Sequence, residues 1–272
     1  MAKPSIKDFF VISLASIYDK IRREEKDVAI KMLNDLKNNL RLLSLDDRLE
    51  IALEISSLFA QIGELDSAED VLFNVIEGLE EISEDEEILR KVARIKAEIV
   101  KISLFKEKYP GDVLENALHL YMKLAKDEKS LIDLLSFLVA LYSEVKKRYK
   151  MYASAKQAIK NALKKVDTIL VSEVRADIHP YIAEALVMLA ELEYETEEIK
   201  QSLEHLFQAM NIYLLLKQEK EALEIALTIA DILKKHGSRE KAIDFLRDFA
   251  SKIVNREIKR LIENKIKKLS TH

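Results

Sequence analysis

The sequence contains no cysteine and no tryptophan, and it has only four glycines and three prolines among 272 residues. The absence of cysteine excludes disulfides, thiolate catalysis and zinc sites built on cysteine. Glycine and proline interrupt helices and mark the turns of β-structure, so their scarcity leaves little room for strands, hairpins or long loops. These deficits predict an all-α protein.

The sequence also lacks a long apolar run. No uncharged stretch approaches the roughly 18 residues that a membrane span needs. Residues 9–15 are apolar and follow Lys3 and Lys7, as in a secretory signal peptide, but Asp8 interrupts the approach. One face of an amphipathic helix explains the pattern better, because the apolar residues lie at helical spacing: Ile6, Phe10, Leu14, Ile17 and Ile21. We therefore expect no membrane partner and no cleaved leader.

Charge is abundant but nearly balanced. Lys and Arg number 44, Asp and Glu number 48, and the formal net charge is −4. A general nucleic-acid binder usually has a basic surface, so this balance argues against nucleic acid as a partner. Apolar residues make up 49% of the chain, enough for a sizeable core. The cysteine-free, Lys/Glu-rich composition is typical of a thermophile's proteins and predicts a cytoplasmic location.

Six copies of one short pattern recur at intervals of roughly 40 to 50 residues. Each copy has a small residue, an apolar residue four positions on and another small or apolar residue three beyond that. The copies are Ala29-Leu33-Leu36, Ala68-Leu72-Val75, Ala117-Tyr121-Leu124, Ala155-Ile159-Ala162, Ser202-Leu206-Ala209 and Ala242-Leu246-Phe249. Such spacing indicates stacked helix pairs, each of which needs its neighbours to bury its apolar face. Small residues let two helices cross closely.

The apolar periodicity and the turn residues together predict thirteen helices, arranged as six antiparallel pairs and a last lone helix. The expected spans are 5–22 with 26–43, 46–62 with 65–79, 84–107 with 112–126, 128–148 with 151–171, 178–195 with 199–215, 219–236 with 239–252, and then 254–269. We expect left-handed glycine caps at Gly63 and Gly237. We expect one continuous domain over residues 1–272, and if the chain divides, the seam should lie near Pro110.

Four of the small anchors follow another small residue by twelve positions: Ser56, Ser143, Ala190 and Ala230. Small residues twelve apart, followed by apolar residues at +4 and +7, resemble the tetratricopeptide repeat (TPR). The best copy runs from Ala52 through Ser56, Gly63 and Ala68 to Val75. The repeats depart from the family's pattern because they are longer and lack its closing proline. The resemblance implies a TPR-like α-solenoid of about six antiparallel helix pairs with a C-terminal capping helix.

The resemblance also implies which residues face a partner, because the first helix of each TPR pair lines the concave surface. Carried over by register, the partner-binding positions are Leu53, Ser57, Phe137, Glu144, Glu184, Val187, Glu191, Tyr194, Glu224, Leu227 and Asp231. The C-terminal groove would then be acidic with an apolar centre, which suits a basic amphipathic helix or peptide. The alternative is that these residues are ordinary solvated helix faces.

Two charge runs have competing explanations: the acidic run could be a docking face for a basic partner and the basic run could bind RNA, or both could be solvated helix surface. The acidic run over residues 64–87 has no Lys or Arg, and the basic run over 145–166 has no acid. Lys156, Lys160 and Lys164 form one stripe on a helix, and Tyr149 and Tyr152 lie nearby, as in some RNA binders. Solvated helix surface is the explanation we favour for both runs.

Motifs for catalysis are missing. No two glycines lie close enough for a phosphate-binding loop, and the spacing of a nucleophile elbow is absent. Glu115 and His119 could share a metal, but helical-bundle metal sites need ligands from several helices, so we expect a half-buried histidine at a helix interface. We therefore expect no catalytic residue, no metal and no cofactor, and a protein-interaction or scaffold module. The alternative is a regulatory sensor of a peptide or small ligand, with Tyr194 and Glu144 lining a closed pocket.

Overall fold

The computed structural model describes residues 5–79, 83–169 and 177–271, and all the regular elements of these residues are helical. The chain divides into two compact units, unit 1 over Met1–Leu124 and unit 2 over Ala125–His272. In each unit antiparallel helix pairs stack on one another, which is the TPR-like solenoid fold predicted from the repeats. The prediction of one continuous domain stays a prediction. Within the described ranges, no helix is both long and apolar enough to cross a membrane.

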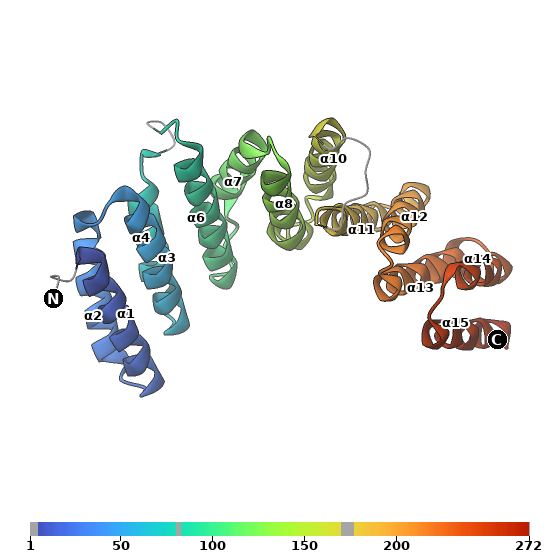
Figure 1. Cartoon of the computed structure of the whole chain (residues 1–272), viewed down its shortest axis with the longest axis horizontal. Coiled ribbons are helices and arrows are strands. Elements are labelled where there is room, and N and C mark those ends of the chain that lie inside the picture. Colours follow the sequence, from blue (N-terminus) through green and yellow to red (C-terminus); the bar gives the residue numbers. More distant parts are fainter. Residues whose placement is uncertain (1–4, 80–82, 170–176, 272) are drawn as a thin grey trace. The chain divides into compact units, whose positions relative to one another are not determined.

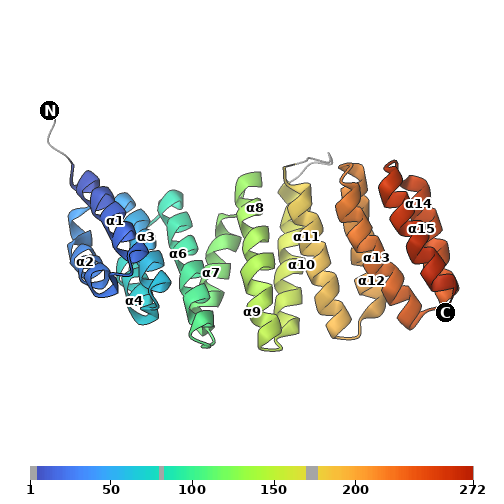
Figure 2. The ribbon, with the colours of Figure 1, turned by 90° about the horizontal axis from the view of Figure 1, so that it is seen from below.

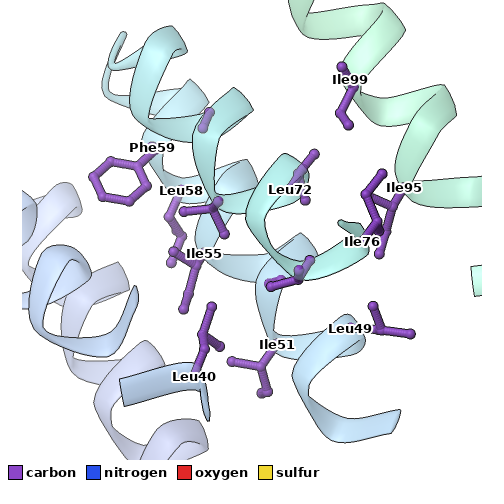
Figure 3. Close-up of a cluster of buried hydrophobic side chains, with 14 of the residues drawn as sticks. Leu40, Leu49, Ile51, Ile55, Leu58, Phe59, Leu72, Ile76, Ile95 and Ile99 are labelled. Atoms are coloured by element: carbon purple, nitrogen blue, oxygen red, sulfur yellow. The ribbon is translucent and has the colours of Figure 1, made fainter. Parts of the chain in front are cut away.

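The described residues of unit 1 form three helix pairs, drawn from blue to green in Figure 1. They are α1 (Ile6–Arg22) with α2 (Lys26–Asn39), which the 3₁₀ turn η1 (Leu40–Leu42) extends; α3 (Leu45–Gln61) with α4 (Leu65–Ile76); and α6 (Glu86–Phe105) with α7 (Gly111–Leu124). Aliphatic side chains from α3, α4 and α6 fill the space between the pairs; Figure 3 shows Ile55, Leu72 and Ile95 among them. All three are fully buried.

Unit 2 contains the remaining pairs and the last helix (Figure 2). They are the continuous helix α8 (Glu128–Phe137), η2 (Leu138–Tyr142) and α9 (Ser143–Arg148) with α10 (Tyr152–Ile169); α11 (His179–Glu195) with α12 (Ile199–Leu215); α13 (Glu219–His236) with α14 (Arg239–Lys252); and α15 (Arg256–Ser270). The η2 segment is one π-helical turn, a feature that the sequence pattern did not predict. Helix α15 packs against α14 and α13 and so caps this unit, as expected.

The small anchors lie where the repeat pattern predicts. All six are at most 1% exposed: Ala29, Ala68, Ala117, Ala155, Ser202 and Ala242. Their partners twelve residues earlier, Ser56, Ser143, Ala190 and Ala230, are at most 3% exposed. In the pair α3–α4 the Ser56 hydroxyl donates a hydrogen bond to the Ala68 carbonyl oxygen at 2.9 Å. This bond shows how closely the two helices cross, because a side chain larger than serine would push the Ala68 backbone away.

One turn geometry recurs between consecutive helices. A residue with positive φ ends the helix, and the next backbone N–H bonds to the carbonyl five residues back, as in the Schellman motif. In the α3–α4 turn Gly63 has φ +88° and Glu64 N–H bonds to Phe59 at 2.9 Å. Five other turns place a charged residue at this position: Glu24, Glu107, Lys150, Glu197 and Lys217. Of these six turns, only the one at Gly63 was predicted from the sequence, because the other five lack the glycine that marks such turns.

The prediction for Gly237 is wrong. Its φ is −120° and its ψ is −110°, so it is not left-handed. Glycine is still required there, because a Cβ would lie 2.8 Å from the carbonyl oxygen of Leu233. The Gly237 N–H donates to that same oxygen at 2.8 Å, and this hydrogen bond closes the last turn of α13.

Candidate functional site

A groove of about 670 Å³ lies within unit 2, between the first helices of two consecutive pairs. Helices α11 and α13 form its walls and α12 its floor, and Figure 2 shows these three helices next to one another. Val139 of the π turn and Lys147 of α9 complete one end. We call it the α11–α13 groove.

The wall from α11 follows one face of that helix. Glu184, Val187, Glu191 and Tyr194 all contribute to it, together with the buried Met188. Val187 and Tyr194 are half-buried, whereas Glu184 and Glu191 are exposed. Partial burial in the groove raises the pKa of the Glu184 carboxyl above its ordinary value. This wall is therefore apolar in its centre and acidic at its edge.

The wall from α13 is likewise apolar in its centre and acidic at its edge. Glu221 and Glu224 stand on its exposed edge, Ile225 and Ile232 are buried, and Thr228 is exposed between them. These residues follow the face i, i+3, i+4, i+7 and i+11 of one helix.

The floor carries two polar groups. Tyr213 of α12 is only 8% exposed, and burial together with the charges of Glu184, Glu221 and Glu224 raises the pKa of its phenol to about 12. All three carboxylates therefore act on one point. Ser202 of α12 is 1% exposed, and its hydroxyl forms no hydrogen bond with any described residue. A buried hydroxyl without a partner is costly, and it can be satisfied by a ligand.

Ion pairs join α9 to the α11 wall of the groove. Lys147 Nζ lies 3.0 Å from a Glu191 carboxylate oxygen and 3.2 Å from one of Glu144. Burial alone would lower the pKa of Lys147, but the hydrogen bonds and charges of Glu191 and Glu144 outweigh it and raise that pKa. The negative charge of Glu191 is thus compensated within the protein.

Tyr194 of the groove lining makes contacts with two residues at the end of α13. Its hydroxyl accepts a hydrogen bond from Lys235 Nζ at 2.7 Å, and the same ammonium lies 5.2 Å from the ring centroid. The imidazole of His236 meets the ring edge to face, with the centroids 5.7 Å apart. These contacts fix the orientation of the Tyr194 ring.

The structure brings five of the eleven predicted partner-binding residues to this groove: Glu184, Val187, Glu191, Tyr194 and Glu224. Glu144 lies beside it, paired with Lys147. Leu227 and Asp231 are outside the lining, and Asp231 pairs instead with Lys265 of α15 at 2.8 Å. Phe137 is buried against Tyr142. Their role in binding a partner stays a prediction.

The other two predicted residues lie in unit 1. Leu53 and Ser57 line a separate groove of about 310 Å³ between α3 and α6. Phe105 at the end of α6 also lines it and is 75% exposed. This smaller groove has no cluster of unpaired carboxylates, because its Glu98 pairs with Lys101 at 2.7 Å.

Sequence reasoning missed Glu221, Ser202 and Tyr213 as groove residues. Ser202 and Tyr213 belong to a second helix of a pair, which the TPR resemblance does not assign to the groove. On α13 the predicted face was Glu224, Leu227 and Asp231, and the observed face is rotated from it. The isoleucines at positions 225 and 232 are the signal that could have revealed the rotation, since they extend the apolar stripe on this side.

The basic stripe on α10 pairs with acids of the next helix pair. Lys156 pairs with Glu198, and Lys160 Nζ lies 3.1 Å from a carboxylate oxygen of Glu193. Glu193 is fully buried and also lies 2.6 Å from His205 Nδ1. Two of the three stripe lysines thus have an intramolecular role, which removes the main argument for RNA.

The acidic run is also partly compensated. Lys106, the residue that follows α6, pairs with Asp66 at 2.5 Å and with Glu69 at 2.6 Å, and Lys37 Nζ lies 3.8 Å from Asp70. Residues 80–82 of the run lie outside the described residues. These pairs link neighbouring helices of unit 1 and explain part of the run without a partner.

Within the described ranges, one group of three carboxylates is close enough to share a metal ion: Asp46, Asp47 and Glu50 of α3. Lysines already compensate this group, since Lys7 Nζ lies 2.6 Å from Asp47 and Lys91 pairs with Asp46 and Glu50. The other predicted candidate was His119 with Glu115. His119 was expected to be half-buried, but it is exposed on α7.

Comparisons with known proteins agree with the fold. No protein-family model and no curated protein sequence matches the chain. Among solved structures the chain is similar to BtubC (BKLC) from P. vanneervenii, with 13% identity, 73% of this chain and 77% of that chain covered, and a TM-score of 0.51. It is similar to the TPR-like repeats of a putative kinesin light chain from Podosopora anserina, with 17% identity, coverage of 80% and 96%, and a TM-score of 0.53. It is also similar to the apo form of RapI, with 14% identity, coverage of 94% and 80%, and a TM-score of 0.53.

Proposed function

We propose that this TPR-like chain is a non-catalytic protein-interaction or scaffold module, and that it binds a helix or extended peptide of a partner protein in the α11–α13 groove. The groove itself carries the proposal: apolar side chains form its centre, glutamates its edges, and the first helices of two consecutive pairs its walls. A partner helix with an apolar stripe and basic flanks is complementary to such a surface. We also propose the cytoplasmic location that the composition predicts.

The walls of the groove are in place without a partner, which supports reversible binding of the partner with no change of fold. The walls belong to long helices of 17 and 18 residues, whose opposite faces are buried in the unit. A partner therefore meets side chains that are already positioned, which reduces the entropy lost on binding. The mechanism involves no covalent step.

The proposal is tested by filling the groove. Thr228 is exposed inside it, and Thr228→Trp places a bulky ring across the path of a partner helix. Thr168→Trp is the matched control, because Thr168 is an exposed threonine of α10 that does not line the groove. A photo-crosslinking residue placed at position 228, and in a separate variant at position 168, identifies the partner in cells. Binding of the purified partner is then measured by calorimetry.

We expect the partner to cross-link from position 228 and not from 168, and its affinity to fall at least about tenfold with Thr228→Trp only, a loss of roughly 1.4 kcal/mol. A partner that binds the Thr228→Trp protein with unchanged affinity refutes the proposal. So does a partner that cross-links equally well from both positions.

A second candidate function is a regulatory sensor of a short peptide or small ligand. The volume of the groove favours it, since about 670 Å³ lies within the range of roughly 300 to 1,000 Å³ typical of small-ligand sites. Tyr194 would contact such a ligand, as the sequence predicted. A metabolite or dipeptide at about 100 times its dissociation constant should stabilise the protein by about 2.7 kcal/mol, which a melting-temperature screen detects. A screen in which only long peptides stabilise the protein excludes this candidate.

A further inference from the structure

The α11–α13 groove holds negative charge that the protein does not compensate. Five glutamates line it: Glu184, Glu191, Glu195, Glu221 and Glu224. Lys147 is the one cation among the described lining residues, and it pairs with Glu191. Glu184, Glu221 and Glu224 have no ion pair with any described residue, although ion pairs are common elsewhere in the two units. By contrast, lysines of neighbouring helices pair with several other acids, namely Asp66, Glu69 and Asp70 of the acidic run and Asp46, Asp47 and Glu50 of α3.

These three carboxylates line the groove together with Tyr213. They come from two helices, Glu184 from α11 and the other two from α13, and each acts on the phenol of Tyr213. Tyr213 is buried beneath them on α12. Like charges around one point repel each other, so this arrangement is unfavourable in the empty groove and is relieved by a cation.

The floor carries a second polar group, nearer the start of α12 than Tyr213. The Ser202 hydroxyl is buried on the lining of the groove and forms no hydrogen bond with any described residue. Ala190 of α11 lies beside it in the lining, and the apolar side chains of Leu206 and Val187 are near. Ser202 lies eleven residues before Tyr213 on α12, about 16 Å away along the helix axis, so it marks a different part of the groove from Tyr213. A long side chain with a charged end fits the part that carries the glutamates, because its aliphatic stem contacts the apolar lining and its end reaches the carboxylates.

We propose that the α11–α13 groove contains a pocket for one arginine side chain of the partner, whose guanidinium binds among Glu184, Glu221 and Glu224 above Tyr213. This inference rests on the proposed function and names the chemistry that the groove recognises. Guanidinium suits the site better than ammonium, because its five N–H donors lie in one plane and serve several acceptors at once. It is also more weakly hydrated, so less solvation is lost when it enters a partly buried site.

The probe is a fluorescein-labelled peptide with one arginine between two leucines, Ser-Leu-Arg-Leu-Ser. Three matched peptides replace the arginine with citrulline, lysine or glutamate. Citrulline keeps the shape of arginine and removes its charge. Fluorescence polarisation measures the affinity of each peptide for the full chain, with titration up to about 10 mM because a single-residue contact can be weak.

We expect the arginine peptide to bind at least about tenfold more tightly than the citrulline peptide, since charge-assisted hydrogen bonds are the strong ones. Glu184→Gln, Glu221→Gln and Glu224→Gln should each weaken it, and the triple variant should abolish the preference for arginine over citrulline. Glu204→Gln is the matched control, because Glu204 is exposed on α12 outside the groove. Circular dichroism checks that each variant is folded.

Several results overturn the inference. They are equal affinity for the arginine and citrulline peptides, tighter binding of the lysine peptide than of the arginine peptide, no saturable binding of the arginine peptide, and an unchanged preference in the triple variant. These failures are distinguishable from failure of the proposed function. If Thr228→Trp blocks the natural partner while the triple variant binds it normally, the groove is an interaction site without a cation pocket.

Discussion

Replacing Ala68 with glutamate should destabilise unit 1 strongly. Ala68 is fully buried in α4, and its carbonyl oxygen accepts the Ser56 hydroxyl of α3 at 2.9 Å. The Cβ of residue 68 therefore lies in the crossing of the two helices, with no room for a longer side chain. A glutamate there must separate the helices, break the Ser56 bond and place a carboxylate in an apolar core.

The expected cost follows from these three effects. Overpacking a core costs about 1–3 kcal/mol, the lost hydrogen bond about 1 kcal/mol, and burial of a polar group about 2 kcal/mol or more. We therefore expect a loss of about 4 kcal/mol. For a unit of this size that corresponds to a fall in melting temperature of roughly 10–15 °C.

Thermal unfolding followed by circular dichroism measures the loss, and hydrogen exchange in α3 and α4 locates it. Ala15→Glu is the control, since Ala15 is an exposed alanine of α1 and should tolerate the same change within about 0.5 kcal/mol. Ala68→Leu adds volume without charge and should cost about 1–3 kcal/mol. An unchanged melting temperature for Ala68→Glu, or equal losses for Ala68→Glu and Ala15→Glu, would show that the small anchors do not set the helix crossings.

Three further substitutions test other parts of the structure. Gly237→Ala should cost about 1–3 kcal/mol in urea unfolding, because its Cβ would lie 2.8 Å from the Leu233 carbonyl oxygen; a loss under about 0.3 kcal/mol contradicts this. Lys150→Gly should stabilise the protein by up to about 1 kcal/mol in the same assay, since a φ of 57° costs lysine more than glycine, and any destabilisation is the adverse result. Burial raises the pKa of Glu184 in the folded state, so the folded protein binds more protons at this residue than the unfolded chain, and its contribution to stability falls as the pH rises from the unfolded pKa through the folded pKa. Glu184→Gln should therefore be more stable than the original protein at neutral pH and equal to it in acid. A gain in stability seen only in acid would contradict this prediction.

The helices could be predicted from the sequence because each must bury one apolar stripe. The expected spans 199–215, 219–236 and 239–252 coincide with α12, α13 and α14. The second helix of the fourth pair was expected over 151–171; α10 begins at Tyr152, and the part of the expected span after Ile169 lies outside the described residues. The turns were predicted worst, since a charged residue with positive φ, such as Lys150 or Glu197, has no signature in the sequence.

The candidate site was only partly predictable. The TPR register assigned Glu184, Val187 and Glu191 of α11 to partner binding, and the structure places all three on the groove lining; their binding role stays a prediction. On α13 the register assigned Glu224, which lines the groove, and Asp231, which does not line it and pairs with Lys265 of α15. The rotation of a helix about its axis depends on all the neighbours that contact it, and a repeat pattern read along one helix does not contain them.

The sequence by itself determined that this protein is helical, that the helices form pairs and that alanines and serines lie at their crossings. These features follow from local periodicity and from the volume of single side chains, both of which are written along the chain. Only the tertiary structure decided which charges are compensated. Glu191 is paired with Lys147, whereas Glu184, Glu221 and Glu224 line the same groove without an ion pair to any described residue. Ion pairs such as Lys147–Glu191 join residues about forty positions apart that meet only when the helices stack.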